Sequence, residues 1–139
     1  MVKLDELIAE SIFKWKWKDV PPECSIIDIP VTNNKVLVNC SENASDEDII
    51  FAMCCELPKY SSNIEHSFYI IEQLNTLGFQ LIKSTKKEGY RATFIKVGFD
   101  PKSKELEKTT YTGKSKNPCI AICLAALKTK NIDVSEYER

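Results

Sequence analysis

Apolar residues repeat at helical spacing in two segments of the first half of the chain. Leu4–Trp15 carries one apolar stripe and is predicted to form a helix, in which Trp15 faces the core and Trp17 is left partly exposed. Ser45 is the expected N-cap of a second, shorter helix that Pro58 ends. The acidic residues that directly follow this serine suit the positive end of a helix dipole, and this explains them without a metal site.

A third helix has the clearest pattern in the chain. Its apolar face runs through Ile64–Leu74, and Ser62 with Glu65 has the spacing of a capping box at its start. Gly78 followed by Phe79 predicts a Schellman closure at its end, because glycine adopts the left-handed conformation that this closure needs. These signals predict one well-capped helix that leads into a strand.

Segments with β-branched or alternating residues are predicted to form antiparallel strands. Ser25–Val31 and Lys35–Cys40 predict a first hairpin, and Gln80–Thr85 with Tyr90–Phe99 predicts a second. Leu106–Thr112 predicts a further strand. Apolar and polar residues alternate along Tyr90–Phe99, so one face of its sheet is expected to be buried.

The last helix is expected to begin with Asn117 as N-cap and Pro118 as its first residue. Helices grouped around hairpins, without strand–helix–strand alternation, favour an α+β fold, here a single-domain α-β-α layered sandwich with an antiparallel sheet. We found no repeat or linker, so residues 1–139 are predicted to form one domain. An acidic insertion at about residues 42–57 and a polar C-terminal tail at 131–139 belong to it.

Composition excludes a membrane protein and gives no reason to expect a metal or cofactor. Of the 139 residues, 43% are hydrophobic and 28% are charged, which is the balance of a globular domain, and the longest apolar runs are too short to span a bilayer. The six cysteines form no C-x-x-C pair, and the N-terminus has no signal-peptide pattern. Free thiols in a reducing cytoplasm are therefore expected.

The net charge of −1 hides a strong asymmetry along the chain. Residues 1–80 hold six lysines and thirteen acidic residues, a net −7, whereas residues 81–116 hold nine lysines and Arg91 against four acidic residues, a net +6. The basic segment ends at the predicted N-terminus of the last helix, where free backbone amides favour an anion. The slightly negative total argues against a broad duplex nucleic-acid surface, so a compact anionic ligand fits better.

Candidate ligand-binding residues follow from this segment. Lys114 and Lys116 stand beside the expected helix start, and an exposed aromatic ring could stack on a base. The Gly113–Ser115 triplet is like the end of a P-loop, but Lys108 occupies the position of the first P-loop glycine, which disfavours a nucleotide hydrolase. The predicted ligand-binding residues are Trp17, Arg91, Tyr111, Lys114, Ser115, Lys116 and Asn117.

No residue is predicted to be catalytic. His66 is the only histidine, and the sequence shows no partner that would make it half of a nucleophile–base pair. A non-enzymatic binding protein is therefore the leading interpretation, and an enzyme that uses His66 as a general base ranks last.

Four stretches of the chain resemble the phage ABA-sandwich domain family. They are Leu4–Glu10, Tyr60–Ser62, Leu77–Phe79 and, most specifically, the helix Pro118–Leu127. The family consists of small phage and prophage proteins with an α-β-α layered fold. The resemblance covers about residues 4–20 and 58–130, departs from the family pattern at the acidic insertion, and carries over no catalytic residue.

A phage origin implies a role in the cytoplasm of the host cell. The leading hypothesis is a small accessory protein that counters host defence by binding and sequestering a small anionic, nucleotide-type immune signal. The alternatives are an inhibitor that binds a host defence protein through the acidic Glu42–Asp48 region and, ranked below it, an enzyme that cleaves a signalling nucleotide. A homo-oligomer is compatible with each, because symmetry can complete a pocket that one small domain lacks.

Overall fold

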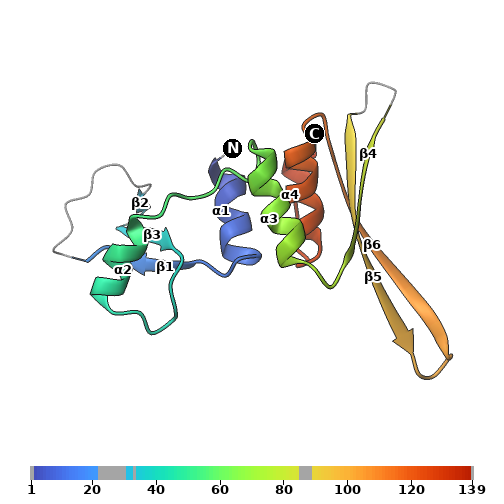
Figure 1. The fold of residues 1–139 in the computed structure, drawn as a ribbon, viewed down its shortest axis with the longest axis horizontal. Helices are drawn as coiled ribbons and strands as arrows, with labels where there is room; N and C mark the ends of the chain where they lie inside the picture. The colour runs from blue at the N-terminus through green and yellow to red at the C-terminus, as the bar shows by residue number, and fades with distance from the viewer. Residues whose placement is uncertain (1, 22–30, 33, 85–88, 139) are drawn as a thin grey trace.

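The computed structural model describes residues 2–21, 31–32, 34–84 and 89–138. Helices and antiparallel strands share the chain, so the predicted α+β fold class is confirmed (Figure 1). The elements are α1 (Val2–Ser11), β1 (Lys16–Asp19), β2 (Val31–Thr32), β3 (Lys35–Val38), α2 (Asp46–Met53), α3 (Ile64–Gln73), β4 (Gly78–Lys83), β5 (Tyr90–Asp100), β6 (Glu105–Ser115), α4 (Pro118–Lys128) and a short 3₁₀ turn, η1 (Ser135–Tyr137).

The first sheet is small and is covered by α2. Its strand order is β1-β3-β2, and both pairings are antiparallel. Alternate residues of β3 point toward α2 and form a hydrophobic cluster of their own with it, consisting of Val36, Val38, Ile49, Ala52 and Met53. Ser45 caps α2 as predicted: its hydroxyl accepts from the Asp48 N–H (3.2 Å), and the Asp48 carboxylate accepts from the Ser45 N–H (3.3 Å).

The second sheet has the order β4-β5-β6 and is antiparallel throughout. Ala92 and Phe94 of β5 are fully buried, whereas Arg91, which points to the other face of the strand, is exposed. The predicted alternation is therefore confirmed. Phe94 lies opposite Phe79 of β4 and Tyr111 of β6. The buried face packs against the helices and belongs to the larger of the two hydrophobic clusters.

Helix α4 is the centre of that larger core. Each residue from Ala121 to Leu127 is completely buried, because α4 packs on β5 and β6 and also contacts α1 and α3. Asn117 caps this helix as predicted, with its Oδ1 accepting from the Cys119 N–H (2.8 Å), and Pro118 occupies the first turn. The polar C-terminal tail is tied to this core, since Val134 is buried in it and Glu138 pairs with Lys128.

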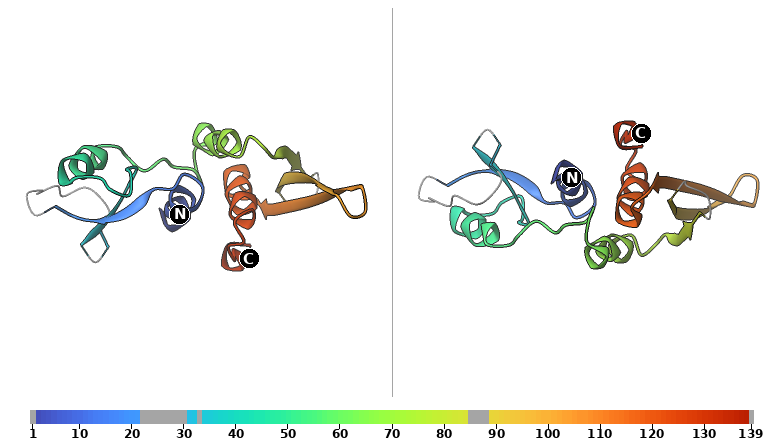
Figure 2. Two further views of the ribbon diagram at one scale, coloured as in Figure 1. Left: turned by 90° about the horizontal axis from the view of Figure 1, so that it is seen from below. Right: turned by 90° about the horizontal axis from the view of Figure 1, so that it is seen from above.

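The molecule is elongated. The first sheet and α2 lie at one end, the helices α1, α3 and α4 lie in the middle, and the second sheet lies at the other end (Figures 1 and 2). The hairpin formed by β5 and β6 extends well beyond the helices (Figure 1). The acidic first turn of α2 and the basic strands β5 and β6 therefore lie toward opposite ends of the molecule.

Four local predictions at helix ends are wrong. Helix α2 ends at Met53, with Cys54 as its C-cap, five residues before the predicted end at Pro58. Helix α1 ends at Ser11, because Lys14 adopts a positive φ of 62° and the chain turns so that Trp15 packs in the core from a loop. Asn63, one residue after the predicted cap, caps α3 through its Oδ1, which accepts from the His66 N–H (3.2 Å). Gly78 begins β4 opposite Ile95 and makes no Schellman closure.

The boundaries of two predicted strands also differ. The strand predicted at Leu106–Thr112 is longer, so Gly113–Ser115 belongs to β6 and is not a loop. In the strand predicted at Ser25–Val31, only the last residue lies inside the described residues, where it begins β2. Between the strands predicted at Gln80–Thr85 and Tyr90–Phe99, residues 85–88 lie outside the described residues.

A buried polar cluster joins α1 to the turn before α3. The Ser61 N–H donates to Asp5 Oδ1 (2.7 Å), and Tyr60 and Cys123 are buried beside this carboxyl group. Burial raises the pKa of the Tyr60 hydroxyl far above its usual range, and the Asp5 charge adds to this shift. The same two causes, in the same order, raise the pKa of the Cys123 thiol.

This cluster predicts a loss of stability at alkaline pH. An unfolded chain releases these protons at about pH 8.5 for cysteine and about pH 10 for tyrosine, while the folded state still holds them. The free energy of unfolding is then unaffected below these values and falls as pH rises, by up to about 1.4 kcal/mol per pH unit for each group. Urea unfolding between pH 7 and pH 11 measures the slope. The double variant Tyr60→Phe with Cys123→Ala should reduce the fall of the free energy of unfolding with pH. The control Tyr69→Phe, which changes an exposed tyrosine, should leave this fall unchanged. The same pH dependence in the natural chain and in both variants would contradict the prediction.

Candidate functional site

The predicted ligand-binding residues lie in separate places. Arg91 and Lys114 face each other across β5 and β6 on the face of the second sheet that points away from α4. Tyr111 lies on the opposite, helix-facing side of β6, because successive residues of a strand alternate between the two faces. Trp17 belongs to β1 in the first sheet, where its Nε1–H donates to Glu10 Oε2 (3.1 Å). No single pocket therefore contains the complete predicted set.

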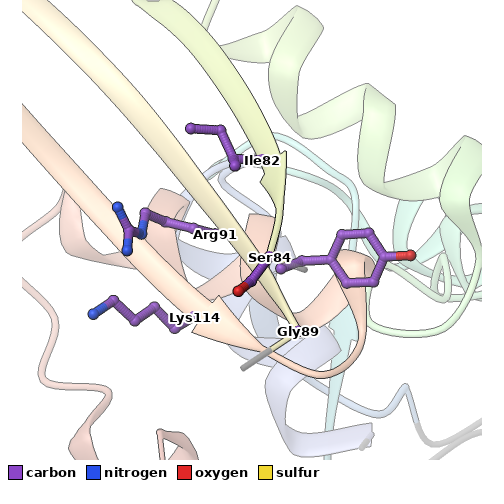
Figure 3. A pocket seen from close by; sticks show the side chains of 6 residues that line it. Ile82, Ser84, Gly89, Arg91 and Lys114 are labelled. Carbon is purple, nitrogen blue, oxygen red and sulfur yellow. The ribbon is translucent and has the colours of Figure 1, made fainter. Parts of the chain in front are cut away.

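Arg91 and Lys114 line a small pocket at the edge of the second sheet (Figure 3). Its volume is about 130 Å³, and Ile82, Ser84 and Gly89 border it. Within the described part of the chain, neither cation makes an ion pair. Because like charges directly opposite each other on a sheet repel, a bound anion would stabilise this pair. The volume suits one anionic group and is well below the roughly 300 Å³ of ordinary ligand pockets.

The predicted helix N-terminus is already satisfied by its own residues. The Asn117 N–H donates to Ser115 Oγ (3.1 Å), and Asn117 Oδ1 caps α4 as described above. Lys116 is exposed beside them. The turn therefore offers fewer free donors to an anion than the sequence suggested.

Tyr111 borders a larger pocket on the helix-facing side of the sheet. This pocket has a volume of about 330 Å³ and contains two lysines, Lys96 from β5 and Lys130 from beyond α4. The C-caps of α3 and α4, Leu74 and Thr129, also line it. The carbonyl groups at these helix ends already accept backbone hydrogen bonds, Leu74 O from the Leu77 N–H (3.0 Å) and Lys128 O from the Asn131 N–H (3.0 Å). The remaining lining residues are Gln73, Asn75, Thr76 and Leu77. No acidic side chain is among the lining residues.

The lining of this pocket suits a ligand that carries an aromatic ring and an anionic group. An aromatic ring can stack on Tyr111, and an anionic group can pair with the two lysines. We call this region, defined by Lys96, Tyr111 and Lys130, the Tyr111 pocket.

The sequence analysis missed both lysines of the Tyr111 pocket. Lys96 is two residues after the buried Phe94 on the same strand face, a signal that the alternation pattern contained. Lys130 follows the last turn of α4, where a basic residue is usually explained by the helix dipole. Only the packing of α4 on β5 and β6 brings these two residues to one pocket.

The acidic segment is exposed at the far end of the molecule. Its first-turn residues Asp46, Glu47 and Asp48 are all exposed on α2, and Phe51 on the same helix has 79% of its surface accessible. Glu42 is exposed as well, and Lys16 Nζ lies 4.0 Å from its carboxylate.

His66 has a structural partner. Its Nδ1 accepts from the Lys59 N–H (2.8 Å), and its ring stacks on Tyr69 with a centroid separation of 5.6 Å. A general base would have to act through the other ring nitrogen.

Among the described residues, no group of three His, Cys, Asp or Glu side chains is placed to hold a metal ion. No helix formed by the described residues is long and apolar enough to cross a membrane.

Comparison of the chain with protein-family models, with curated proteins and with solved structures finds no significant match. The site must therefore be interpreted from its own chemistry.

Proposed function

We propose that this protein binds a small nucleotide-type anion in the Tyr111 pocket. The observation that carries the proposal is the combination of one aromatic ring and two lysines, neither of them paired with an acid among the described residues, around a volume of about 330 Å³. That volume falls within the ordinary range of ligand pockets, whereas the Arg91–Lys114 pocket would hold only a single anionic group.

In this proposal each part of a nucleotide has a counterpart in the pocket. The phosphate pairs with Lys96 and Lys130 through charge-assisted hydrogen bonds. The base stacks on the ring of Tyr111.

The biological role proposed is sequestration without turnover. The sequence resemblance to phage ABA-sandwich proteins supports a counter-defence protein that removes a signalling nucleotide in the cytoplasm of the host cell. An immune signal is a suitable target, because a stoichiometric binder can silence a ligand that is present at low concentration.

Native mass spectrometry of the protein with a panel of cyclic and ADP-ribose-type nucleotides tests the proposal. We expect one retained ligand of unchanged mass per chain. Lys96→Gln and Lys130→Gln should each weaken binding by about tenfold or more, since each removes a charged hydrogen-bond donor. Lys102→Gln and Lys104→Gln, on the exposed turn between β5 and β6, are the matched controls and should leave binding unchanged.

Other outcomes are equally informative. Loss of binding in Arg91→Gln but not in Lys96→Gln would move the ligand to the Arg91–Lys114 pocket. Conversion of the ligand to a lighter product, abolished by His66→Ala, would establish the enzyme instead. Retention of no nucleotide from the panel would overturn the proposal.

A second candidate function is inhibition of a host protein through α2. The exposed Phe51, one helical turn from the exposed Glu47, favours it, because aromatic residues are enriched at the centre of protein interfaces and the rim of such interfaces is polar. Affinity capture from host lysate with the natural chain and with Glu47→Gln separates this function from nucleotide binding.

A further inference from the structure

The distal half of the β5–β6 hairpin, residues 97–108, is an arm with one apolar face. Strand β4 pairs with β5 only as far as Ile95, so the rest of β5 is paired on one side alone. On the face that points away from α4, Val97, Phe99 and Leu106 expose 62%, 62% and 74% of their surface. Phe99 lies directly opposite Leu106 in the register, so these side chains form one contiguous patch.

The charges on this face all have one sign. Lys108 lies opposite Val97, and Arg91 and Lys114 lie further along the same face. The acidic residues of these two strands are Asp100, Glu105 and Glu107, and by strand alternation they point to the other face. The arm therefore presents an apolar patch bordered by lysine and arginine.

Helix α2 presents the opposite combination at the other end of the molecule. Phe51 is exposed and borders a hollow of about 310 Å³ together with Ala44, Ala52 and the acidic Asp48. Asp46 and Glu47 are exposed in the same first turn. We call this hollow, defined by Ala44, Asp48, Phe51 and Ala52, the α2 groove.

We propose that the arm of one molecule docks in the α2 groove of a second copy of this chain. In this contact Phe99 and Leu106 cover Phe51, and Lys108 approaches the acidic residues of the partner. Arm against arm, or groove against groove, would bring like charges together, so the contact is head-to-tail. The two surfaces lie at opposite ends of the molecule (Figure 1), so a chain cannot satisfy its own groove and association continues from copy to copy.

Sedimentation velocity over a series of protein concentrations at low salt tests the proposal. We expect oligomers that grow with concentration and dissociate in about 1 M salt, where screening acts within about 3 Å. Phe99→Ser with Leu106→Ser, the arm variant, and Phe51→Ser, the groove variant, should each weaken association by about tenfold or more. Phe68→Ser is the matched control, because this aromatic side chain on α3 is also exposed (47%) but lies outside both surfaces.

Mixing the two variants distinguishes a head-to-tail contact from a symmetric one. The arm variant keeps an intact groove and the groove variant keeps an intact arm, so a 1:1 mixture should form heterodimers and nothing larger. Circular dichroism shows whether each variant is folded. A natural chain that stays monomeric at every concentration, or a mixture that stays monomeric while the natural chain associates, would overturn the proposal. Neither result depends on nucleotide binding, since both surfaces lie outside the Tyr111 pocket.

Discussion

Replacing Gly113 with alanine is expected to destabilise the protein by about 3 kcal/mol, at the upper end of the cost of overpacking a core. Gly113 lies on β6 where the strand passes directly under α4. A Cβ atom here would be 2.4 Å from the Ala121 carbonyl oxygen and 2.5 Å from the Ala125 backbone nitrogen. Since both are backbone atoms of a buried helix, they cannot move aside as a flexible side chain would.

Urea denaturation of the two proteins measures this effect directly. Gly98→Ala on β5 is the matched control, because no atom lies within 4 Å of its added Cβ. Alanine has a lower conformational entropy cost than glycine in a strand, so this control should be neutral or slightly stabilising. If Gly113→Ala were as stable as the natural chain, the close approach of β6 and α4 would be wrong. The result bears on function as well: it explains Gly113 by helix packing, so this glycine needs no phosphate-binding role.

Truncation of Phe94 to alanine is expected to cost about 3–5 kcal/mol. Its side chain is fully buried between the second sheet and the helices, and its ring centroid lies 5.0 Å from that of Phe79. Removal of the ring leaves a cavity in the core that also supports Tyr111, so nucleotide binding should weaken together with stability.

Thermal and urea unfolding of Phe94→Ala quantify the loss. Phe99→Ala on the same strand is the control, since Phe99 is exposed and its truncation should change stability by less than about 0.5 kcal/mol. Similar costs for the two variants would show that the second sheet does not bury the predicted face.

Elements whose signals are local could be predicted from the sequence. Ser45 and Asn117 were identified as caps because a cap needs only a short polar side chain a few bonds from the backbone amide that it binds. The buried face of β5 was identified because a strand that packs on one side has a period of two residues. The α+β class followed from the order of these elements.

Helix ends with two adequate local choices could not be predicted. Ser62 and Asn63 both suit an N-cap, and the structure uses Asn63. The His66 N–H donates to the Asn63 side chain, and the His66 ring accepts from the Lys59 N–H. Trp15 continues the apolar stripe of α1, yet it enters the core from a loop, since its burial does not require a helical backbone.

The sequence by itself determined that this protein has a basic segment, an acidic segment and helices with apolar stripes. The stripe predicted for α3 is not the buried one throughout, since Ile64 and Phe68 are exposed whereas Ser67 and Ile70 are buried. Tertiary structure decided which of the charged residues meet. Tyr111 and Lys114 are only three residues apart, but the pleat of β6 sends them to opposite faces of the sheet. Lys96 and Lys130 are far apart in the chain and share one pocket because α4 lies across β5 and β6. The physical reason is that local patterns specify which side of an element is apolar, whereas the partner of that side depends on how whole elements pack around a common core.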